Sequence, residues 1–337
     1  MSVSQFTKYT SSDASGPGVL TGAAGTLLAL LDACLVNGYS GKTAAGWTKP
    51  YSNSSNSGCY KQGAGAGFGV VINDNGGNAT STYKEAWATG WQTITAVTAP
   101  VGTGSGQFPT AAQLNTSGYV GVRKSASADS TGRAWVLFAD ASTFYLFVAS
   151  GDTTGHYMEF MFGDFYALAG ASGDPYRCAV VARSTPNSGS LNNTSGTMLG
   201  AMDFMENPSN GTGGYGPGLY IANNLTGSSG SLQSYVYGDL GKATSQTTAQ
   251  YRAGLVPCPN PYDNSFYMSP VFLADVTLAV RGYFRGLYHV CHPNTSFTDG
   301  QTFNGAGDFS GKTFQIVSLG SGQGYHAIET SNTVPTD

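Results

Sequence analysis

Charged side chains are scarce in this sequence. Asp, Glu, Lys and Arg together make up 10% of its 337 residues, whereas soluble domains usually contain about 25%. Because free monomers generally hold many surface charges for solubility, the scarcity predicts that neighbouring subunits cover much of the exterior. A secreted protein with a surface rich in Ser, Thr and Asn is the alternative. No run of Lys or Arg forms a track for phosphates, so we expect no direct binding to nucleic acid.

Targeting and membrane signals are also missing. The segment from Met1 to Leu20 contains Lys8 and Asp13 but no apolar core, which is not the pattern of a signal peptide. The longest apolar stretch, Leu27 to Val36, includes Asp32 and is too short to span a bilayer. The sequence therefore predicts a protein that is made in the cytoplasm and does not enter a membrane.

Metal-binding and catalytic motifs are weak or absent. The five cysteines are an odd number without CxxC spacing, which favours buried thiols over a disulfide framework or a zinc knuckle. His289-Val290-Cys291-His292 is the one local cluster that could hold a metal, but on a strand His292 would point away from the other two. No Gly-x-Ser-x-Gly elbow is present. We expect no metal, no cofactor and no enzymatic activity.

Two segments match only the end of a phosphate-binding motif. Gly41-Lys42-Thr43 and Gly311-Lys312-Thr313 end as a Walker A motif does, yet Val36 and Ala306 stand where the motif needs its first glycine. The glycine run from Gly63 to Gly69 lacks the GxGxxG spacing of dinucleotide sites. That run predicts either a mobile loop or a tight backbone contact, and not a nucleotide site.

Pairs of carboxylates leave one chemical alternative open. A glycosidase needs two carboxylates in a cleft, and Glu159 with Asp164 or Asp203 with Glu206 could supply them. A chain with 19 acidic residues contains such pairs by chance. Aromatic residues nearby could stack on sugars, so hydrolysis or binding of a polysaccharide, for example a host-surface glycan, is kept as an alternative.

One segment has helical periodicity. Its apolar residues recur at helical spacing, with Thr26 as a plausible N-cap and Asn37-Gly38 as a stop signal; they are Leu27, Leu28, Leu31, Cys34 and Leu35. The pattern predicts one amphipathic helix over about residues 26–37, packed on a sheet.

The remaining sequence alternates between strand-like runs and segments rich in Gly, Ser and Asn. The runs from Ala134 to Ala139 and from Phe144 to Val148 are apolar on both faces and flank a short polar turn, which predicts a hairpin at the centre of the main core. Further strands are expected at 67–72, 81–87, 119–123, 156–162, 176–182, 218–221, 234–237, 271–283, 314–319 and 325–330. The fold predicted is mainly β, an antiparallel sandwich or barrel with one notable helix and long Gly/Ser/Asn loops.

A chain of this length can form one large domain or two ordinary ones. Polar residues from Ser125 to Thr131 mark a weak boundary. It would divide the chain into a helix-containing β region over 1–128 and a larger antiparallel β domain over 129–337, and a single domain is the alternative. No fixed-period repeat is present, which disfavours a β-helix.

Several segments spread over nearly the whole chain resemble uncharacterised virion structural proteins of tailed bacteriophages and prophages. They are Arg281 to His289 with His292-Pro293, Asp299-Gly300 and Ile328 to Asn332; Leu31 to Tyr39 with Ala45 to Pro50; and Arg133 to Phe147. The resemblance implies a virion component present in many copies, whose partners are copies of itself and other virion proteins. The tail, baseplate or neck region is favoured. The alternatives are a capsid decoration protein and, from another class, a receptor-binding or polysaccharide-degrading tail protein.

One segment is a candidate contact site within that interpretation. Arginine and aromatic residues are favoured at protein interfaces, and they are concentrated here at Arg281, Tyr283, Phe284, Arg285 and Tyr288. The alternative is an ordinary strand that ends in a glycine turn. No catalytic residues accompany the resemblance, so none are assigned.

Overall fold

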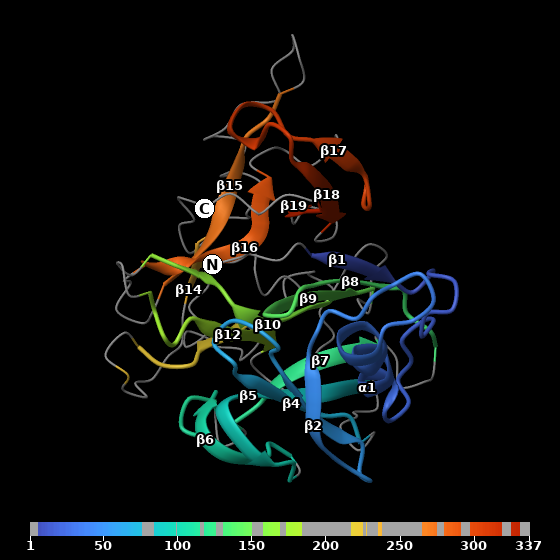
Figure 1. Cartoon of the computed structure of the whole chain (residues 1–337), viewed down its shortest axis with the longest axis vertical. Helices are drawn as coiled ribbons and strands as arrows, with labels where there is room; N and C mark the ends of the chain where they lie inside the picture. Colours follow the sequence, from blue (N-terminus) through green and yellow to red (C-terminus); the bar gives the residue numbers. More distant parts are fainter. Residues whose placement is uncertain are drawn as a thin grey trace.

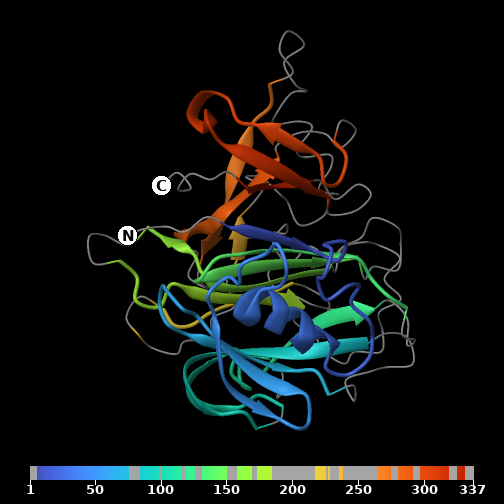
Figure 2. The same cartoon turned by 45° about the vertical axis from the view of Figure 1, so that its right-hand side comes forward.

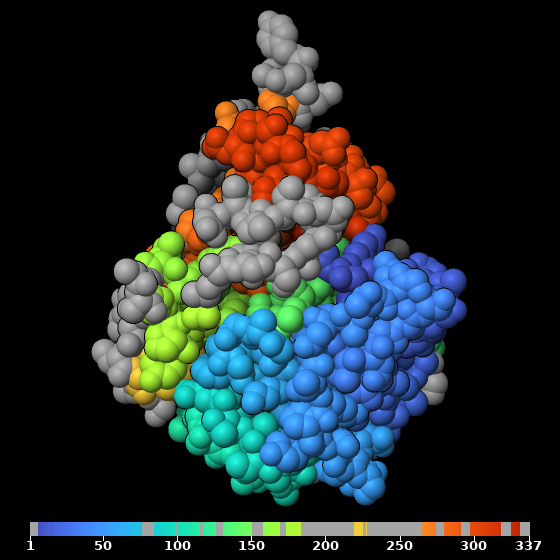
Figure 3. Space-filling model, in the orientation of Figure 1, coloured from blue at the N-terminus to red at the C-terminus, as the bar shows by residue number. Residues whose placement is uncertain are grey.

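The computed structural model describes residues 6–75, 84–98, 100–114, 118–125, 131–149, 158–168, 173–183, 217–224, 227, 235–237, 265–274, 280–290, 297–318 and 325–330. The protein is mainly β, as predicted. In these ranges, antiparallel strands form one sheet of 12 strands and one of 7. The smaller sheet stands on one side of the larger one (Figures 1 and 2). In the space-filling view it forms one end of the molecule, coloured orange to red (Figure 3).

The large sheet has the order β1-β8-β9-β10-β12-β7-β5-β4-β3-β2, with β13 beside β12 and β6 beside β5. In chain order its strands are β1 (Thr7–Thr10), β2 (Thr48–Asn53), β3 (Ser57–Lys61), β4 (Gly69–Asn73), β5 (Lys84–Ala96), β6 (Thr103–Phe108), β7 (Val120–Ser125), β8 (Trp135–Ala139), β9 (Thr143–Val148), β10 (Met158–Asp164), β12 (Cys178–Arg183) and β13 (Pro217–Ile221).

The small sheet has the order β14-β15-β16-β19-β18-β17, with β11 beside β16. A short 3₁₀ helix, η3 (Gly307–Phe309), precedes β18. The strands are β11 (Tyr166–Ala167), β14 (Tyr235–Tyr237), β15 (Met268–Ala274), β16 (Val280–Val290), β17 (Thr302–Asn304), β18 (Thr313–Ser318) and β19 (Tyr325–Glu329). The single strand predicted from Val271 to Tyr283 is therefore two strands, which pair with each other.

The predicted boundary near residue 128 does not separate two structural units. β1 pairs with β8, and β7 pairs with β12, so strands from both sides of residue 128 belong to the same sheet. The chain first enters the small sheet after residue 164, at β11, returns to the large sheet for β12 and β13, and then forms the rest of the small sheet from β14 to β19. The polar run that suggested a boundary follows β7, inside the segment that connects β7 to β8.

The predicted helix is present with the expected bounds. It begins as the α-helix α1 (Thr26–Leu31), continues as the π-helix η1 (Asp32–Asn37), and ends at Gly38, whose φ of 72° stops it. The N-cap residue is Gly25 and not Thr26. The Thr26 hydroxyl donates to backbone carbonyls, while the Asp74 carboxylate accepts the Leu27 N–H at 2.8 Å and so satisfies the first turn.

The hairpin of β8 and β9 is buried on both faces, as predicted, and it lies between two apolar cores instead of at the centre of one. Leu137, Phe144 and Leu146 face the first core, which also includes Leu27 and Leu31 of the helix. The alternate residues Phe138, Tyr145 and Phe147 face the second core, where the large sheet packs against residues such as Val271, Phe284 and Ile328 of the small sheet. The hairpin thus connects the core below the helix to the core between the sheets.

No helix in the residues that the structure describes is both long enough and apolar enough to cross a membrane.

Candidate functional site

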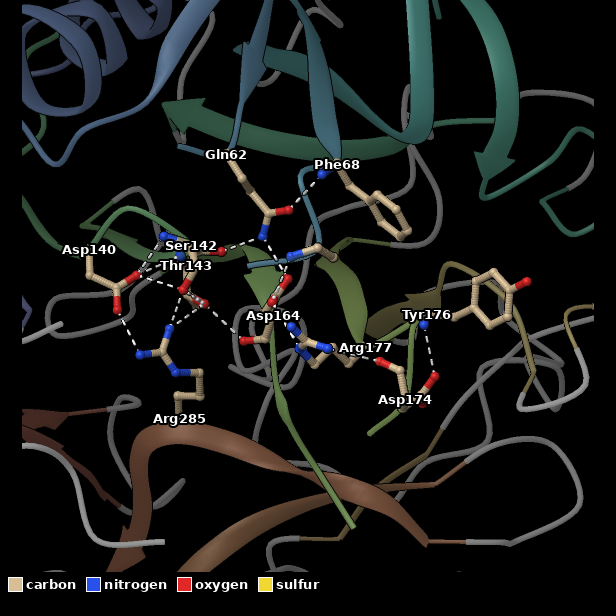
Figure 4. A network of polar contacts seen from close by, with 11 residues as sticks. Gln62, Phe68, Asp140, Ser142, Thr143, Asp164, Asp174, Tyr176, Arg177 and Arg285 are labelled. Carbon is tan, nitrogen blue, oxygen red and sulfur yellow. Dashed lines mark hydrogen bonds and ion pairs between the residues drawn. The ribbon is translucent and has the colours of Figure 1, made fainter. Parts of the chain in front are cut away.

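Buried polar side chains gather where the two sheets meet. The chain leaves β10 at Asp164 and enters β11 at Tyr166, with Phe165 buried at the bend. The Phe165 N–H donates to the Arg177 carbonyl at 3.0 Å, which ties this bend to the start of β12. The network drawn in Figure 4 surrounds this junction. It is the candidate functional site because it joins segments far apart in sequence.

The polar turn of the β8–β9 hairpin forms one part of the junction. Asp140 Oδ1 accepts the backbone N–H groups of Ser142 at 2.7 Å and Thr143 at 2.8 Å. Asp140 Oδ2 lies 2.7 Å from Nη2 of Arg285, which reaches across from β16 (Figure 4). Burial alone would lower the pKa of Arg285, but the Asp140 carboxylate beside it raises that pKa above its ordinary value. This ion pair holds the turn to the small sheet.

Asp164 forms a second part, at the end of β10. Its Oδ1 accepts the side-chain amide of Gln62 at 2.7 Å, and its Oδ2 accepts the Ala66 N–H at 3.0 Å and Nε of Arg177 at 3.2 Å. Gln62 in turn accepts the Phe68 N–H at 2.7 Å. Burial raises the pKa of Asp164, although these donors oppose the shift. The carboxyl group thus anchors the glycine-rich loop to the junction.

The glycine run from Gly63 to Gly69 makes a tight backbone contact here, which was one of the two predicted outcomes. A Cβ atom at Gly63 would overlap the carbonyl oxygen of Gly46. Gly65 has a φ of 79°, and a Cβ atom there would overlap the Asp164 carboxylate. Glycine is required at these positions because the backbone passes too close to its neighbours for a side chain.

Arg281, at the start of β16, forms a third part. Its Nε donates to Asp174 Oδ2 at 2.9 Å, and Nη1 donates to the Asn223 carbonyl at 2.9 Å. Asp174 also accepts the Tyr176 N–H at 2.8 Å, which is visible in Figure 4. Both charged side chains are fully buried. The guanidinium therefore connects β16 to the segment before β12, through Asp174, and to the segment after β13, through Asn223.

The segment predicted to contact a neighbouring subunit lies mostly inside the chain. Arg281, Phe284, Arg285 and Tyr288 are all buried, so the prediction of an intermolecular contact is wrong for these four side chains. Phe284 and Arg285 contact the β8–β9 hairpin of the large sheet, and Arg281 binds the segments beside β12 and β13. The Tyr288 ring packs within the small sheet, against Phe309 and Phe314. Tyr283 is partly exposed and remains the member of the group with accessible surface.

Close backbone packing accompanies these side-chain contacts. A Cβ atom at Gly282 would overlap the carbonyl oxygen of Tyr166, because β11 pairs with β16 at this position. The ring of Tyr283 lies between those of Tyr166 and Phe272 on the adjacent strands, at centroid distances of 5.2 and 6.0 Å. Gly282 is thus needed because two paired strands approach each other closely there, and it does not form a flexible turn.

The carboxylate pair Glu159 and Asp164 is not assembled as a glycosidase would need. Glu159 lies 3.8 Å from Nδ1 of His326 on β19, whereas Asp164, five residues further along β10, binds the glycine-rich loop and Arg177. His326 is also close to His289 on β16, with ring centroids 6.0 Å apart. Among the described residues, no three His, Cys, Asp or Glu side chains could hold a metal ion together.

Other predicted candidates lie outside the described residues: Asp203, Glu206, Cys291 and His292. The three cysteines in the described ranges are buried free thiols, namely Cys34, Cys59 and Cys178. Burial raises the pKa of the Cys34 thiol, which makes it a poor nucleophile.

An unusually large share of the charged residues is buried. The chain has 15 basic and 19 acidic residues, and 12 of these are buried in the described part of the structure: Asp74, Glu85, Arg123, Lys124, Asp140, Glu159, Asp164, Asp174, Arg281, Arg285, Lys312 and Glu329. At most 22 charged residues therefore remain for the whole exterior. A soluble domain of average composition and equal length would have roughly 84 charged residues in total. The composition predicts few surface charges, and the burial of these 12 residues reduces their number further.

No protein-family model matches this chain, and a search of curated proteins finds no match.

Proposed function

We propose that this protein is a structural component of a tailed-phage virion, in the tail, baseplate or neck region, which acts through contacts with copies of itself and with other virion proteins. The observation that carries the proposal is the placement of charge. A chain with few ionisable residues has at least 12 of them buried inside its own fold, and its exterior is correspondingly weakly charged.

An exterior of this kind suits association. Removing a charged group from water costs several kcal/mol unless a partner compensates it, whereas Gly, Ser, Thr and Asn lose less when a neighbour covers them. The cores of protein interfaces are accordingly depleted in charged residues. A weakly charged surface therefore favours burial against other subunits over dispersal as single molecules.

Exposed apolar side chains support the same conclusion and provide the contact candidates. Leu168 is 56% exposed and Val280 is 47% exposed, and they are neighbours because the Leu168 N–H donates to the carbonyl of Arg281. Partly exposed Tyr283 lies on the same strand as Val280. Among the residues that the structure describes, the large exposed apolar side chains are those of Val19, Tyr51, Leu168, Tyr267 and Val280.

The buried junction has a mechanical role in this proposal. Ion pairs of Arg281 with Asp174 and of Arg285 with Asp140 fix the orientation of the small sheet on the large one. A subunit that must make the same contacts in every copy requires such a fixed geometry. These ion pairs are contacts within one chain. Their Arg and Asp side chains are at most 7% exposed, so they are not available to a partner.

The proposal is tested on particles. Virions released by the phage or prophage that encodes this chain would be purified by density gradient, and their proteins quantified by mass spectrometry. We expect peptides of this chain at many copies per particle. Particles that form normally without it would refute the proposal. Incubation of the purified protein with host polysaccharide tests the other class, since released reducing ends would identify a polysaccharide-degrading tail protein.

A further inference from the structure

A lysine and an aspartate are enclosed together beneath the helix. Lys124 lies on β7 and shares its face with Val120 and Val122, which belong to the apolar core below α1. Asp74 follows β4 directly. The side chains of Lys124 and Asp74 are both fully buried and contact each other through Nζ and Oδ1. They are 50 residues apart in sequence.

The polar atoms around this pair are arranged asymmetrically. Lys124 Nζ donates to the Ala23 carbonyl at 2.7 Å, which orients the amine. Asp74 Oδ2 accepts the N–H of Leu27 at 2.8 Å, and the carboxyl group also accepts a backbone hydrogen bond from Leu28. Oδ2 is thus held by the start of the helix, and Oδ1 faces the amine.

Burial shifts the protonation of both groups toward neutrality. Desolvation lowers the pKa of Lys124 and raises the pKa of Asp74, although their mutual attraction opposes both shifts. An uncharged amine is a nucleophile, and a desolvated lysine is a common way of obtaining one in a protein. A protonated carboxyl group can lose its hydroxyl as water.

We propose that Lys124 and Asp74 condense to form an intramolecular amide bond. The Nζ lone pair attacks Cγ of Asp74, and a new C–N bond forms. The negative charge that develops on Oδ2 is stabilised by the Leu27 N–H, which donates to this oxygen and acts as an oxyanion-hole donor. One amine proton passes to the protonated Oδ1, the C–Oδ1 bond breaks, and one water molecule leaves.

The reaction needs no oxidant, metal or cofactor, because an amine and a carboxylic acid give an amide and water. Holding the two groups together provides an effective concentration of about 10⁵–10⁸ M in well-oriented cases, which favours condensation that dilute groups in water do not undergo. The remaining amide N–H still faces the Ala23 carbonyl. The bond would join β7 covalently to the end of β4, while the start of the helix keeps its hydrogen bond to Asp74 Oδ2. It would protect a virion subunit against local unfolding.

The test is the intact mass of the purified full-length protein. We expect a mass lower than the sequence mass by one water molecule, and a branched peptide after proteolysis that contains both Asp74 and Lys124. Lys124→Arg removes the nucleophile, so its mass should equal the value for its own sequence. Comparison of the two proteins cancels any processing at the N-terminus, which both share.

Lys312→Arg is the matched control. Lys312 Nζ lies 2.9 Å from Glu329, but this pair is not fully enclosed, with side chains 8% and 2% exposed, and we expect it to remain an ion pair. The mass deficit should therefore persist in Lys312→Arg. A wild-type mass equal to the sequence mass, or a deficit that persists in Lys124→Arg, would overturn the proposal. The wild-type measurement alone decides the matter if the variants fail to fold.

Discussion

Arg285 is a residue whose loss should weaken the junction strongly. Arg285→Ala would leave the Asp140 carboxylate fully buried without its cation, and removing one partner of a buried pair usually costs about 3–5 kcal/mol. The variant would also lose contacts of the guanidinium with the rings of Phe6 and Tyr166. Asp140 keeps its hydrogen bonds from Ser142 and Thr143, which places the expected cost near the lower end of that range, about 3 kcal/mol.

Urea unfolding followed by tryptophan fluorescence measures this cost as a shift of the midpoint at unchanged slope. Lys49→Ala is the control, because Lys49 and Asp32 form an ion pair at a similar distance, 2.8 Å, but with side chains 21% and 30% exposed. Such pairs contribute about 0–1 kcal/mol. Equal losses in Arg285→Ala and Lys49→Ala would refute the reasoning that burial of the junction makes its ion pairs important.

Three further changes test other contacts. Gly65→Ala forces a side chain onto the Asp164 carboxylate at a positive φ and should lower the free energy of unfolding by about 1–3 kcal/mol; an unchanged denaturation midpoint would contradict this. Burial raises the pKa of Asp164 above the ordinary 3.8, so the folded state binds the proton more tightly than the unfolded state. The resulting stabilisation is complete below pH 3.8 and is lost as the pH rises through the raised folded pKa. Asp164→Asn should remove this pH dependence, and an identical pH profile would count against the shift. Phe147→Ala, at a fully buried position between the sheets, should cost about 3–5 kcal/mol; a thermal shift equal to that of an exposed substitution would exclude its place in the core.

Parts of the fold that bury apolar residues could be predicted from the sequence. The hairpin of β8 and β9 is apolar on both faces, and the apolar residues from Thr26 to Asn37 recur at helical spacing. In both segments, the residues that form the sequence pattern are the residues that the fold buries. Strands such as β2 (TKPYSN) and β6 (TGSGQF) were missed because they have few buried residues. They become strands through pairing with β3 and β5, and the proline in β2 is tolerated because that strand forms the edge of the sheet.

The junction could be predicted only in part. Arginines and tyrosines from Arg281 to Tyr288 indicate an interface, but the same residue types serve contacts within a chain and between chains. The acidic partners are distant in sequence: Asp174 lies 107 residues before Arg281. Likewise, no local pattern joins Lys124 to Asp74. Only the fold shows which charged residues are buried. Because they are removed from the surface, the exterior has even fewer charges than the composition alone indicates.

The central claim is that neighbouring subunits cover much of this weakly charged exterior. Analytical ultracentrifugation of the purified protein at micromolar concentration, in buffers of low and moderate salt, tests it most directly. The account predicts a discrete closed oligomer, such as a ring of three, five, six or twelve chains, that persists when salt is raised because its contacts are mostly uncharged. A stable monomer at every concentration and salt level would contradict the account.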